Sequence, residues 1–203
     1  AKKGSGTIGD LRYEAGITAK GVAVGSSVAG SDTAVITFAQ PFNDTPIVMA
    51  SPGQYAVTVS PYPVITRVFD VTKEGFKVIL LRQSGVTAKS VRSCDVSYVA
   101  IERGQTLDGS GHVVTVRDTT ITFTSTLTNY KFFYGNDDLL ANPKVLVQMQ
   151  SYDVPCYSVL RTYGTGPTEY YHRVRLQTDD TNAEYGTVSS TKKYTERVGY
   201  IVV

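Results

Sequence analysis

The chain has 203 residues and a formal net charge of +2 at pH 7, with 41% hydrophobic and 19% charged residues. This is the composition of an ordinary globular protein, long enough for one large β domain or two small ones. So small a net charge gives no general attraction to nucleic acid or anionic membranes, and no apolar stretch reaches the roughly 20 residues of a membrane-spanning helix. We therefore expect neither a nucleic-acid partner nor membrane insertion.

Residues 1–33 are rich in Gly, Ala and Ser, with only short apolar pairs. Such a segment cannot bury enough surface by itself to offset the entropy that is lost when it becomes ordered. We expect an extended N-terminal arm, which is either a flexible leader or a segment that orders against a partner or another subunit. Its first residues, AKKGSGTIGD, include two lysines but no apolar run, unlike a signal peptide.

From residue 34 onward, Val, Ile, Thr and Tyr dominate the periodic segments, and these residues suit a pleated, half-buried sheet surface. Clusters of Gly, Pro, Asn and Asp separate the segments. The predicted strands are Ala34–Phe38, Pro46–Ser51, Val64–Phe69, Gly75–Leu81, Ser93–Glu102, Val113–Arg117, Thr119–Thr124, Pro143–Gln150, Tyr157–Tyr163, His172–Thr178 and Glu196–Val203. The nearest helical segment is Asp137–Ala141, one turn at most, so the pattern predicts an all-β protein.

Four of these strands recur in the same order in the second half of the chain. The recurring sets are Pro46, Val48, Ala50 and Tyr55 with Pro143, Val145, Val147 and Tyr152, 97 positions later; Arg67 with Arg161, 94 later; Phe76, Val78 and Leu80 with His172, Val174 and Leu176, 96 later; and Val96, Tyr98 and Ala100 with Val198, Tyr200 and Val202, 102 later. The separations change in loops, where insertions cost little. We infer a duplication, against the alternative of chance similarity among β-rich segments.

The repeat predicts two modules, residues 34–103 and 119–203, joined by a linker at 104–118 that contains the turn DGSG. The core face of each closing strand is predicted to carry alternate residues, Val96, Tyr98 and Ala100 and then Val198, Tyr200 and Val202. Gly199 replaces Ser97 of the first copy, and a glycine inside a strand marks the close approach of another backbone or side chain. The last predicted strand runs to Val203, so its removal should unfold the second module.

The runs ITFAQPFNDTPIVMAS, VITRVFDVTKEGFKV and VSYVAIERG resemble the H-type lectin module, and ERVGYIVV resembles the closing strand of its bacterial members. The resemblance covers residues 34–103 and, more weakly, 119–203. It implies two tandem antiparallel six-stranded β-sandwich modules, assembly into trimers or hexamers, and N-acetylgalactosamine-type sugars bound near subunit interfaces. Lectins of this family place aromatic residues, often Trp, and a nearby His beside the sugar, but the matching stretch LRQSGVTAKSVRSCDVSYVA has neither. Modules of this type also occur in bacteriophage tail and virion proteins.

The sequence carries no residue pattern of an enzyme. The two histidines, His112 in the turn GSGH and His172 at a core position, are expected to be structural. The Asp137–Asp138 and Asp179–Asp180 pairs lie in predicted loops without a calcium-loop pattern, so we expect solvated turns. We therefore predict no catalytic residue, no metal and no cofactor.

The two cysteines, Cys94 and Cys156, lie 62 positions apart without the spacing of a zinc site. They are interpreted as two free thiols in a reducing compartment, with a disulfide between the modules as the alternative. Cys94 lies on a predicted strand beside Asp95, with no clustered bases to lower a thiol pKa, so we expect no reactive nucleophile.

Sugars bind by stacking their apolar ring faces on aromatic side chains and by accepting hydrogen bonds from groups such as Arg. Arg67 and Arg161 recur at equivalent strand positions, and Tyr55 and Tyr152 recur beside loops. We predict these four residues as carbohydrate contacts. The alternatives are a structural ion pair or a packing stem for the arginines and subunit contact for the tyrosines.

The absence of Trp and His from the matching stretch favours assembly over monosaccharide binding. The sequence predicts a non-enzymatic virion or surface-assembly protein, of the bacteriophage tail or head accessory type, that forms homo-oligomers through its sandwiches and anchors to other virion or surface-assembly proteins by residues 1–33. The alternative is a carbohydrate-binding adhesin that recognises cell-surface glycans, and a weaker one is a secreted accessory module that tethers an enzyme. The leading hypothesis places the protein in the virion, assembled in the host cytoplasm, and the alternative places it outside the cell.

Overall fold

The computed structural model describes residues 3–18, 22–26, 33–55, 64–82, 93–123, 130–133, 144–153, 158–163, 171–178 and 194–203. Within these ranges the chain forms strands and turns and no helix, which confirms the all-β prediction. No helix long and apolar enough to cross a membrane is found there. The helical turn considered at Asp137–Ala141 lies outside the described residues.

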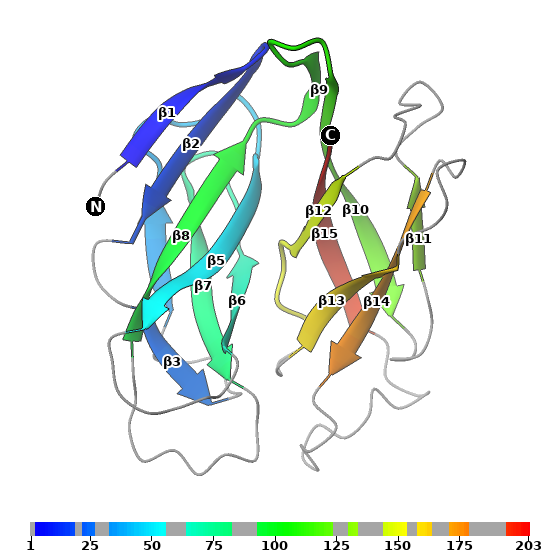
Figure 1. Ribbon diagram of the computed structural model, residues 1–203. Helices are drawn as coiled ribbons and strands as arrows, with labels where there is room; N and C mark the ends of the chain where they lie inside the picture. Colours follow the sequence, from blue (N-terminus) through cyan, green and yellow to red (C-terminus); the bar gives the residue numbers. More distant parts are fainter. Residues whose placement is uncertain are drawn as a thin grey trace.

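The strands of the first half are β1 (Lys3–Ile8), β2 (Leu11–Ile17), β3 (Val22–Ser26), β4 (Ala34–Thr37), β5 (Ile47–Tyr55), β6 (Val64–Phe69), β7 (Gly75–Arg82) and β8 (Ser93–Ile101). Those of the second half are β9 (Gly104–Leu107), β10 (Val113–Phe123), β11 (Tyr130–Phe133), β12 (Val145–Met149), β13 (Ser158–Tyr163), β14 (Tyr171–Thr178) and β15 (Tyr194–Val202). Figure 1 shows the two halves side by side.

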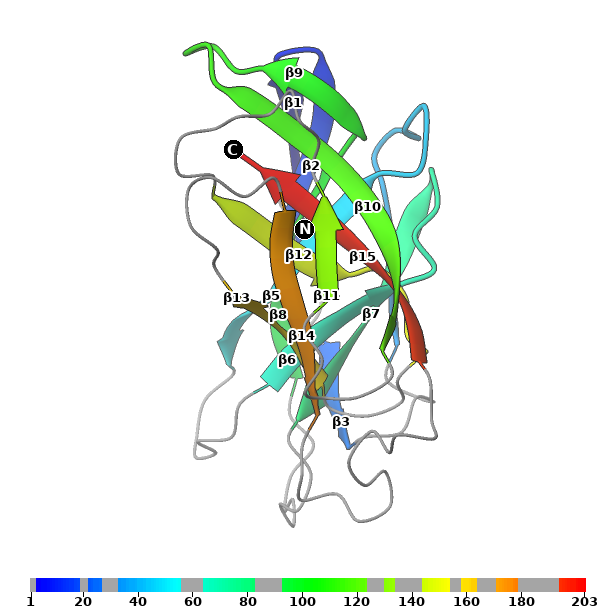
Figure 2. The same cartoon turned by 90° about the vertical axis from the view of Figure 1, so that its right-hand side faces the viewer.

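The strands form four layers. In the first half, layer A (β1, β2, β8 and β5) and layer B (β4, β7 and β6) are joined through β3, which pairs antiparallel with β8 and parallel with β7. In the second half, layer C (β9, β10, β15 and β12) and layer D (β11, β14 and β13) are separate sheets. Seen from the side of the second half, layer D lies in front of layer C (Figure 2).

The two halves share their strand order and register. Layer A runs β1-β2-β8-β5 and layer C runs β9-β10-β15-β12; layer B runs β4-β7-β6 and layer D runs β11-β14-β13. Val48 pairs with Ala100 across β5 and β8, and Val145 pairs with Val202 across β12 and β15. Val145 follows Val48 by 97 positions, and Val202 follows Ala100 by 102 positions, which are the separations of the sequence repeat. The two pairs are therefore equivalent. The strand pairing therefore follows the sequence repeat.

The structure corrects the expectation of an arm and a linker. Within residues 1–33, β1 and β2 form a hairpin, and β2 pairs with β8. Within residues 104–118, β9 and the first part of β10 form a second hairpin, and β10 pairs with β15. The physical reason is that a short strand without an apolar face of its own is still held by backbone hydrogen bonds at the edge of an existing sheet. β10 is also continuous where two strands were predicted.

Each half has its own core between its two layers. Val96, Tyr98 and Ala100 of β8 are at most 5% exposed and lie in the first core. Val198, Tyr200 and Val202 of β15 are at most 3% exposed and lie in the second. Both core faces predicted from strand alternation are confirmed. In the first core Cys94 is a buried free thiol, whose pKa is raised by burial and by the nearby Asp95, and Cys156 lies outside the described residues.

Candidate functional site: the seam between the two halves

A third hydrophobic cluster lies between the two halves and contains residues of both. Its buried members are Leu11, Ile47 and Ile101 of the first half and Val114, Val116 and Ile201 of the second. These residues alternate with the core-facing ones, so they belong to the outer faces of layers A and C, which meet in this cluster. We call this cluster, together with the polar contacts described next, the seam. Each of these side chains stabilises the pairing of the halves by about 1.5–3 kcal/mol if it is fully buried there.

A buried ion pair crosses the seam. Arg67 of β6 and Glu196 of β15 are both 0% exposed, and Arg67 Nη2 lies 2.8 Å from Glu196 Oε1. Arg67 Nη1 also contacts the sulfur of Met149, and its guanidinium carbon lies 5.5 Å from the centre of the Tyr152 ring. A cation and a carboxylate are buried at acceptable cost only when they are paired and hydrogen-bonded, so this arginine depends on the second half.

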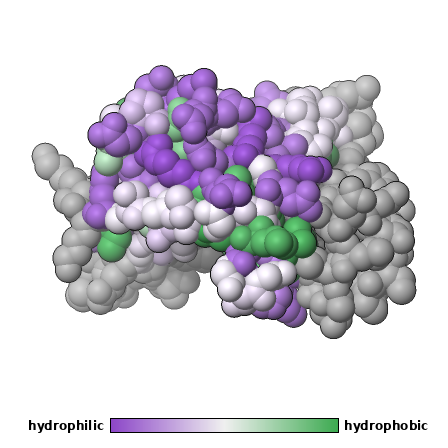
Figure 3. Space-filling view, turned by 90° about the horizontal axis from the view of Figure 1, so that it is seen from above, coloured by the Kyte–Doolittle hydropathy of each residue, from purple (hydrophilic) through white to green (hydrophobic). Residues whose placement is uncertain are grey.

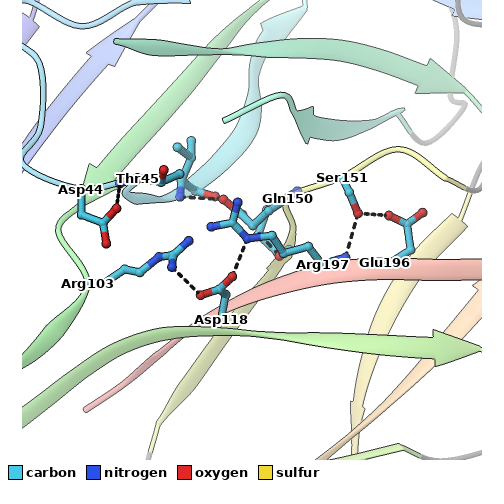
Figure 4. A network of polar contacts seen from close by, with 10 residues as sticks. Asp44, Thr45, Arg103, Asp118, Gln150, Ser151, Glu196 and Arg197 are labelled. Carbon is cyan, nitrogen blue, oxygen red and sulfur yellow. Dashed lines mark hydrogen bonds and ion pairs between the residues drawn. The ribbon is translucent and has the colours of Figure 1, made fainter. Parts of the chain in front are cut away.

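The Glu196 carboxylate has further donors. Ser151 Oγ donates a hydrogen bond to Oε2, and the backbone N–H of Asp153 donates to Oε1 over 3.1 Å. Ser151 Oγ in turn accepts a hydrogen bond from the N–H of Arg197 over 2.7 Å. Figure 4 shows Ser151 between Glu196 and Arg197. The segment after β12 thus surrounds the carboxylate and holds it toward Arg67.

Gln150 closes the edge of β5. Its side-chain oxygen accepts a hydrogen bond from Val48 N–H over 2.9 Å, and its side-chain nitrogen donates to Val48 C=O over 2.7 Å. The carboxamide thus occupies the place of a neighbouring strand, and Gln150 is 2% exposed. Unpaired groups at a sheet edge favour pairing with another chain, and here the second half of the same chain satisfies them.

Gly199 of β15 is the point of closest approach. A Cβ atom at this position would lie 2.7 Å from Ile47 Cγ2 and 3.0 Å from Gln150 Cγ. Real Cβ atoms do not come within 3.0 Å of a neighbour, so only glycine fits without displacement. The close approach predicted from this strand glycine is confirmed.

Two arginines converge on Asp118 of β10 beside the seam (Figure 4). Arg103 Nη1 lies 3.2 Å from Asp118 Oδ1, and Arg197 Nε contacts Oδ2. Burial raises the pKa of Asp118, the carboxylate of Asp44 raises it further, and Arg103 opposes both. The cluster connects the β8–β9 turn, β10 and β15, and so reinforces the seam where the chain passes from one half to the other.

A second buried carboxylate holds the β1–β2 hairpin. Glu14 of β2 is 0% exposed and accepts hydrogen bonds from Tyr98 Oη over 2.9 Å and from Ala39 N–H over 2.7 Å. Lys3 Nζ lies 3.5 Å from the same carboxylate. Burial, and then Glu14, raise the pKa of the Tyr98 phenol, which therefore stays protonated and donates. This contact fixes part of the predicted arm to the first core.

The structure brings together two of the four predicted carbohydrate contacts. Arg67 and Tyr152 meet in the seam, where the Tyr152 ring centre lies 5.6 Å from that of Phe69. Arg67 has no exposed surface, so the alternative of a structural ion pair describes its position. Tyr55 pairs with Cys94 and Arg161 with Arg175 in strand register, and the side chains of Tyr55 and Arg161 lie outside the described part. For Tyr55 and Arg161 sugar contact stays a prediction.

Of the histidines and aspartate pairs considered for chemistry, only the side chain of His112 belongs to the described part. His112 is exposed, and its Nδ1 lies 3.1 Å from Oδ2 of Asp108. His172 occupies β14 in register with Phe132, and both aspartate pairs, Asp137–Asp138 and Asp179–Asp180, lie outside the described residues. Sequence reasoning missed Glu196 and Gln150. A charged residue on the core-facing row of Val198 and Tyr200 was the indication available for Glu196, because such a charge needs a buried partner.

Among the described residues, no group of three or more His, Cys, Asp or Glu side chains could hold a metal ion.

Comparison with known proteins does not assign a function to this geometry. The chain matches no protein-family model, no curated protein and no solved structure.

Proposed function

We propose that this protein is a non-enzymatic structural component of a virion or surface assembly, built from two tandem β-sandwich modules of the H-type lectin kind that act as one rigid unit. The seam is the observation that carries the proposal. An assembly component must hold a fixed shape while its neighbours bind to it, and a tandem protein achieves this when its modules are packed on each other.

The composition of the seam supports a permanent contact between the modules. Domains that move relative to each other usually meet through polar, partly hydrated surfaces. Here Arg67, Glu196 and Gln150 are at most 2% exposed, and an apolar cluster lies beside them. The equal strand order of the two halves supports the tandem arrangement.

Homo-oligomerisation, as a trimer or hexamer, is the second part of the proposal. Among the described strands β12 is the last of layer C and pairs on one side only, with β15. Leu146 of β12 is 59% exposed and Val203 beside it is 43% exposed. Seen from above, most of the described surface is hydrophilic or neutral, and a smaller hydrophobic area, coloured green, lies among these parts (Figure 3). An edge strand with exposed apolar residues is a suitable surface for another copy of the chain.

Native mass spectrometry over a wide range of concentrations tests this proposal. We expect a closed oligomer for the wild type, and a shift to monomer for Leu146→Glu, since the charge would be buried in the contact. Val35→Glu is the matched control, because Val35 is 70% exposed on β4, which belongs to a different sheet from β12. A wild type that is monomeric at every concentration would overturn the assembly function.

A further inference from the structure

The outer face of layer A continues beyond the seam. The core-facing residues of β8 alternate with Ser97, Val99 and Ile101, which therefore belong to the outer face. Residues that are paired directly across strands share a face. The register of β2, β8 and β5 thus places three rows on the outer face: Tyr13, Ile101 and Ile47; Ala15, Val99 and Met49; and Ile17, Ser97 and Ser51.

The second half covers mainly the first of these rows. Ile47 and Ile101 are 0% and 5% exposed and lie in the seam. The middle row is partly buried throughout, and its Val99 and Met49 pack against the seam cluster. In the last row Ile17 is 42% exposed and both serines are exposed. Exposure therefore rises with distance from the seam, and the sheet face extends further than the surface that covers it.

These three rows carry no charged residue. Apart from the two serines, every member is apolar or aromatic. An antiparallel sheet with one face in water normally alternates apolar residues toward the core with polar residues toward the solvent. The outer face of layer A departs from this pattern, so it is suited to burial against another surface.

The equivalent row of the second half shows what this position contacts. Val116, Ile201 and Leu146 form a row of layer C, since Ile201 pairs with both of the others. Ile201 follows Val99 by 102 positions and Leu146 follows Met49 by 97, the separations of the repeat. Val116 and Ile201 are 0% and 5% exposed in the seam, whereas Leu146 is 59% exposed. Each layer thus contributes to the seam and keeps an uncovered apolar part beside it.

We propose that the uncovered part of the layer A face, the rows of Val99 and Ser97, receives Leu146 of a second copy of the chain. The inference rests on the homo-oligomer proposed above and names the surface that Leu146 meets there. The seam supports this occupant, because it already joins the outer face of layer A to outer residues of layer C. An uncharged face also buries Leu146 without leaving a charge unpaired. Contact between two different patches suits a closed trimer, since cyclic rings are built from head-to-tail contacts.

Native mass spectrometry of the full chain, with a charge introduced into the layer A face, tests the inference. Ile17→Glu and Ser97→Arg change exposed side chains of the last row, away from the seam. Each should convert the wild-type oligomer to monomer, with the apparent Kd raised at least about tenfold, because the new charge would be buried in the contact. Val35→Glu on β4 is the control and should leave the oligomer intact. Thermal unfolding of each variant establishes that it is folded.

A mixture of two variants tests whether the two patches bind each other. Leu146→Glu keeps the layer A face intact, and isotope-labelled Ile17→Glu keeps Leu146 intact. The mixture should therefore form a dimer of one labelled and one unlabelled chain and nothing larger, although each variant alone is monomeric. This dimer should be weaker than the wild-type oligomer, because it lacks the further contacts that close a ring.

The outcomes separate the inference from the assembly function. If folded Ile17→Glu and Ser97→Arg keep the wild-type oligomer while Leu146→Glu does not, the inference is overturned and the assembly function stands. The inference is also overturned if the mixture yields no mixed dimer, since the two patches then do not bind each other. A wild type that is monomeric at every concentration overturns the assembly function itself, and the inference with it.

Discussion

Arg67 and Glu196 form a fully buried ion pair, 2.8 Å between Nη2 and Oε1, although they are 129 positions apart and belong to different halves of the chain. The pair therefore makes the folding of one half depend on the presence of the other.

Removing one member of this pair should strongly destabilise the protein. Glu196→Gln leaves the Arg67 guanidinium buried without its counter-charge, which costs about 3–5 kcal/mol in the free energy of unfolding. Arg67→Met/Glu196→Met should recover much of that loss, because apolar residues of similar volume can replace a buried pair. Urea unfolding of the single and double variants measures both effects.

Lys77→Ala is the control for charge removal as such. It breaks the exposed Lys77–Asp70 pair, whose side chains are 44% and 59% exposed, and should cost no more than about 1 kcal/mol. A loss as small as this for Glu196→Gln would contradict the role given to the buried pair.

Gly199→Ala should destabilise the seam by about 1–3 kcal/mol, because the new methyl group meets Ile47 at 2.7 Å and the neighbours must shift. Gly4→Ala in β1 is the control, since nothing lies within 4 Å of a Cβ at that position. Thermal unfolding compares the two variants with the wild type. Equal midpoints for both variants would show that the approach at Gly199 is not tight.

Gln150→Leu keeps the size of the side chain and removes both hydrogen bonds to Val48. The buried N–H and C=O of Val48 then lose their partners, at about 1–3 kcal/mol for each group. Hydrogen exchange at the Val48 amide should become faster, and the unfolding free energy should fall. Gln148→Leu removes a single contact of 3.3 Å to Thr66 C=O and should have a smaller effect. Unchanged exchange at Val48 in Gln150→Leu would refute the edge-closing role.

The raised pKa of Asp118 predicts that the stability of the protein depends on pH. Its folded pKa lies above the ordinary 3.8, chiefly because burial disfavours the charge. The folded state then holds the proton more tightly than the unfolded chain, so this group contributes stability at low pH that is lost as the pH rises through the folded pKa. We expect the unfolding free energy of the wild type, relative to Asp118→Asn, to fall as the pH rises from the ordinary pKa of 3.8 through the raised folded pKa. Urea unfolding at a series of pH values measures the difference, and a rise with pH would be inconsistent with the raised pKa.

The core strands were predictable because their apolar residues alternate strictly. Val96, Tyr98 and Ala100 identify the buried face of β8 without further information, and the repeat transfers the same face to β15. Gly199 was also informative, since a strand glycine without a turn nearby indicates a close neighbour.

The edge strands and the seam were not predictable in this way. β1 reads KGSGTI and is largely exposed, and β2 has the charged Glu14 at a fully buried position, which breaks the apolar alternation. The sequence repeat pairs Arg67 with Arg161, and Arg67 does form an important contact of the seam. Its partner Glu196, however, comes from the other half, and no local pattern connects residues 129 positions apart.

Native-state hydrogen exchange at low denaturant, measured separately for the amides of β8 and β15, tests most directly whether the two halves form one unit. Both are central strands, β8 in the first half and β15 in the second. We predict that they exchange through the same global opening, with equal free energies that fall together in Glu196→Gln. A markedly lower free energy for one strand, and a response to Glu196→Gln confined to β15, would contradict the rigid tandem unit.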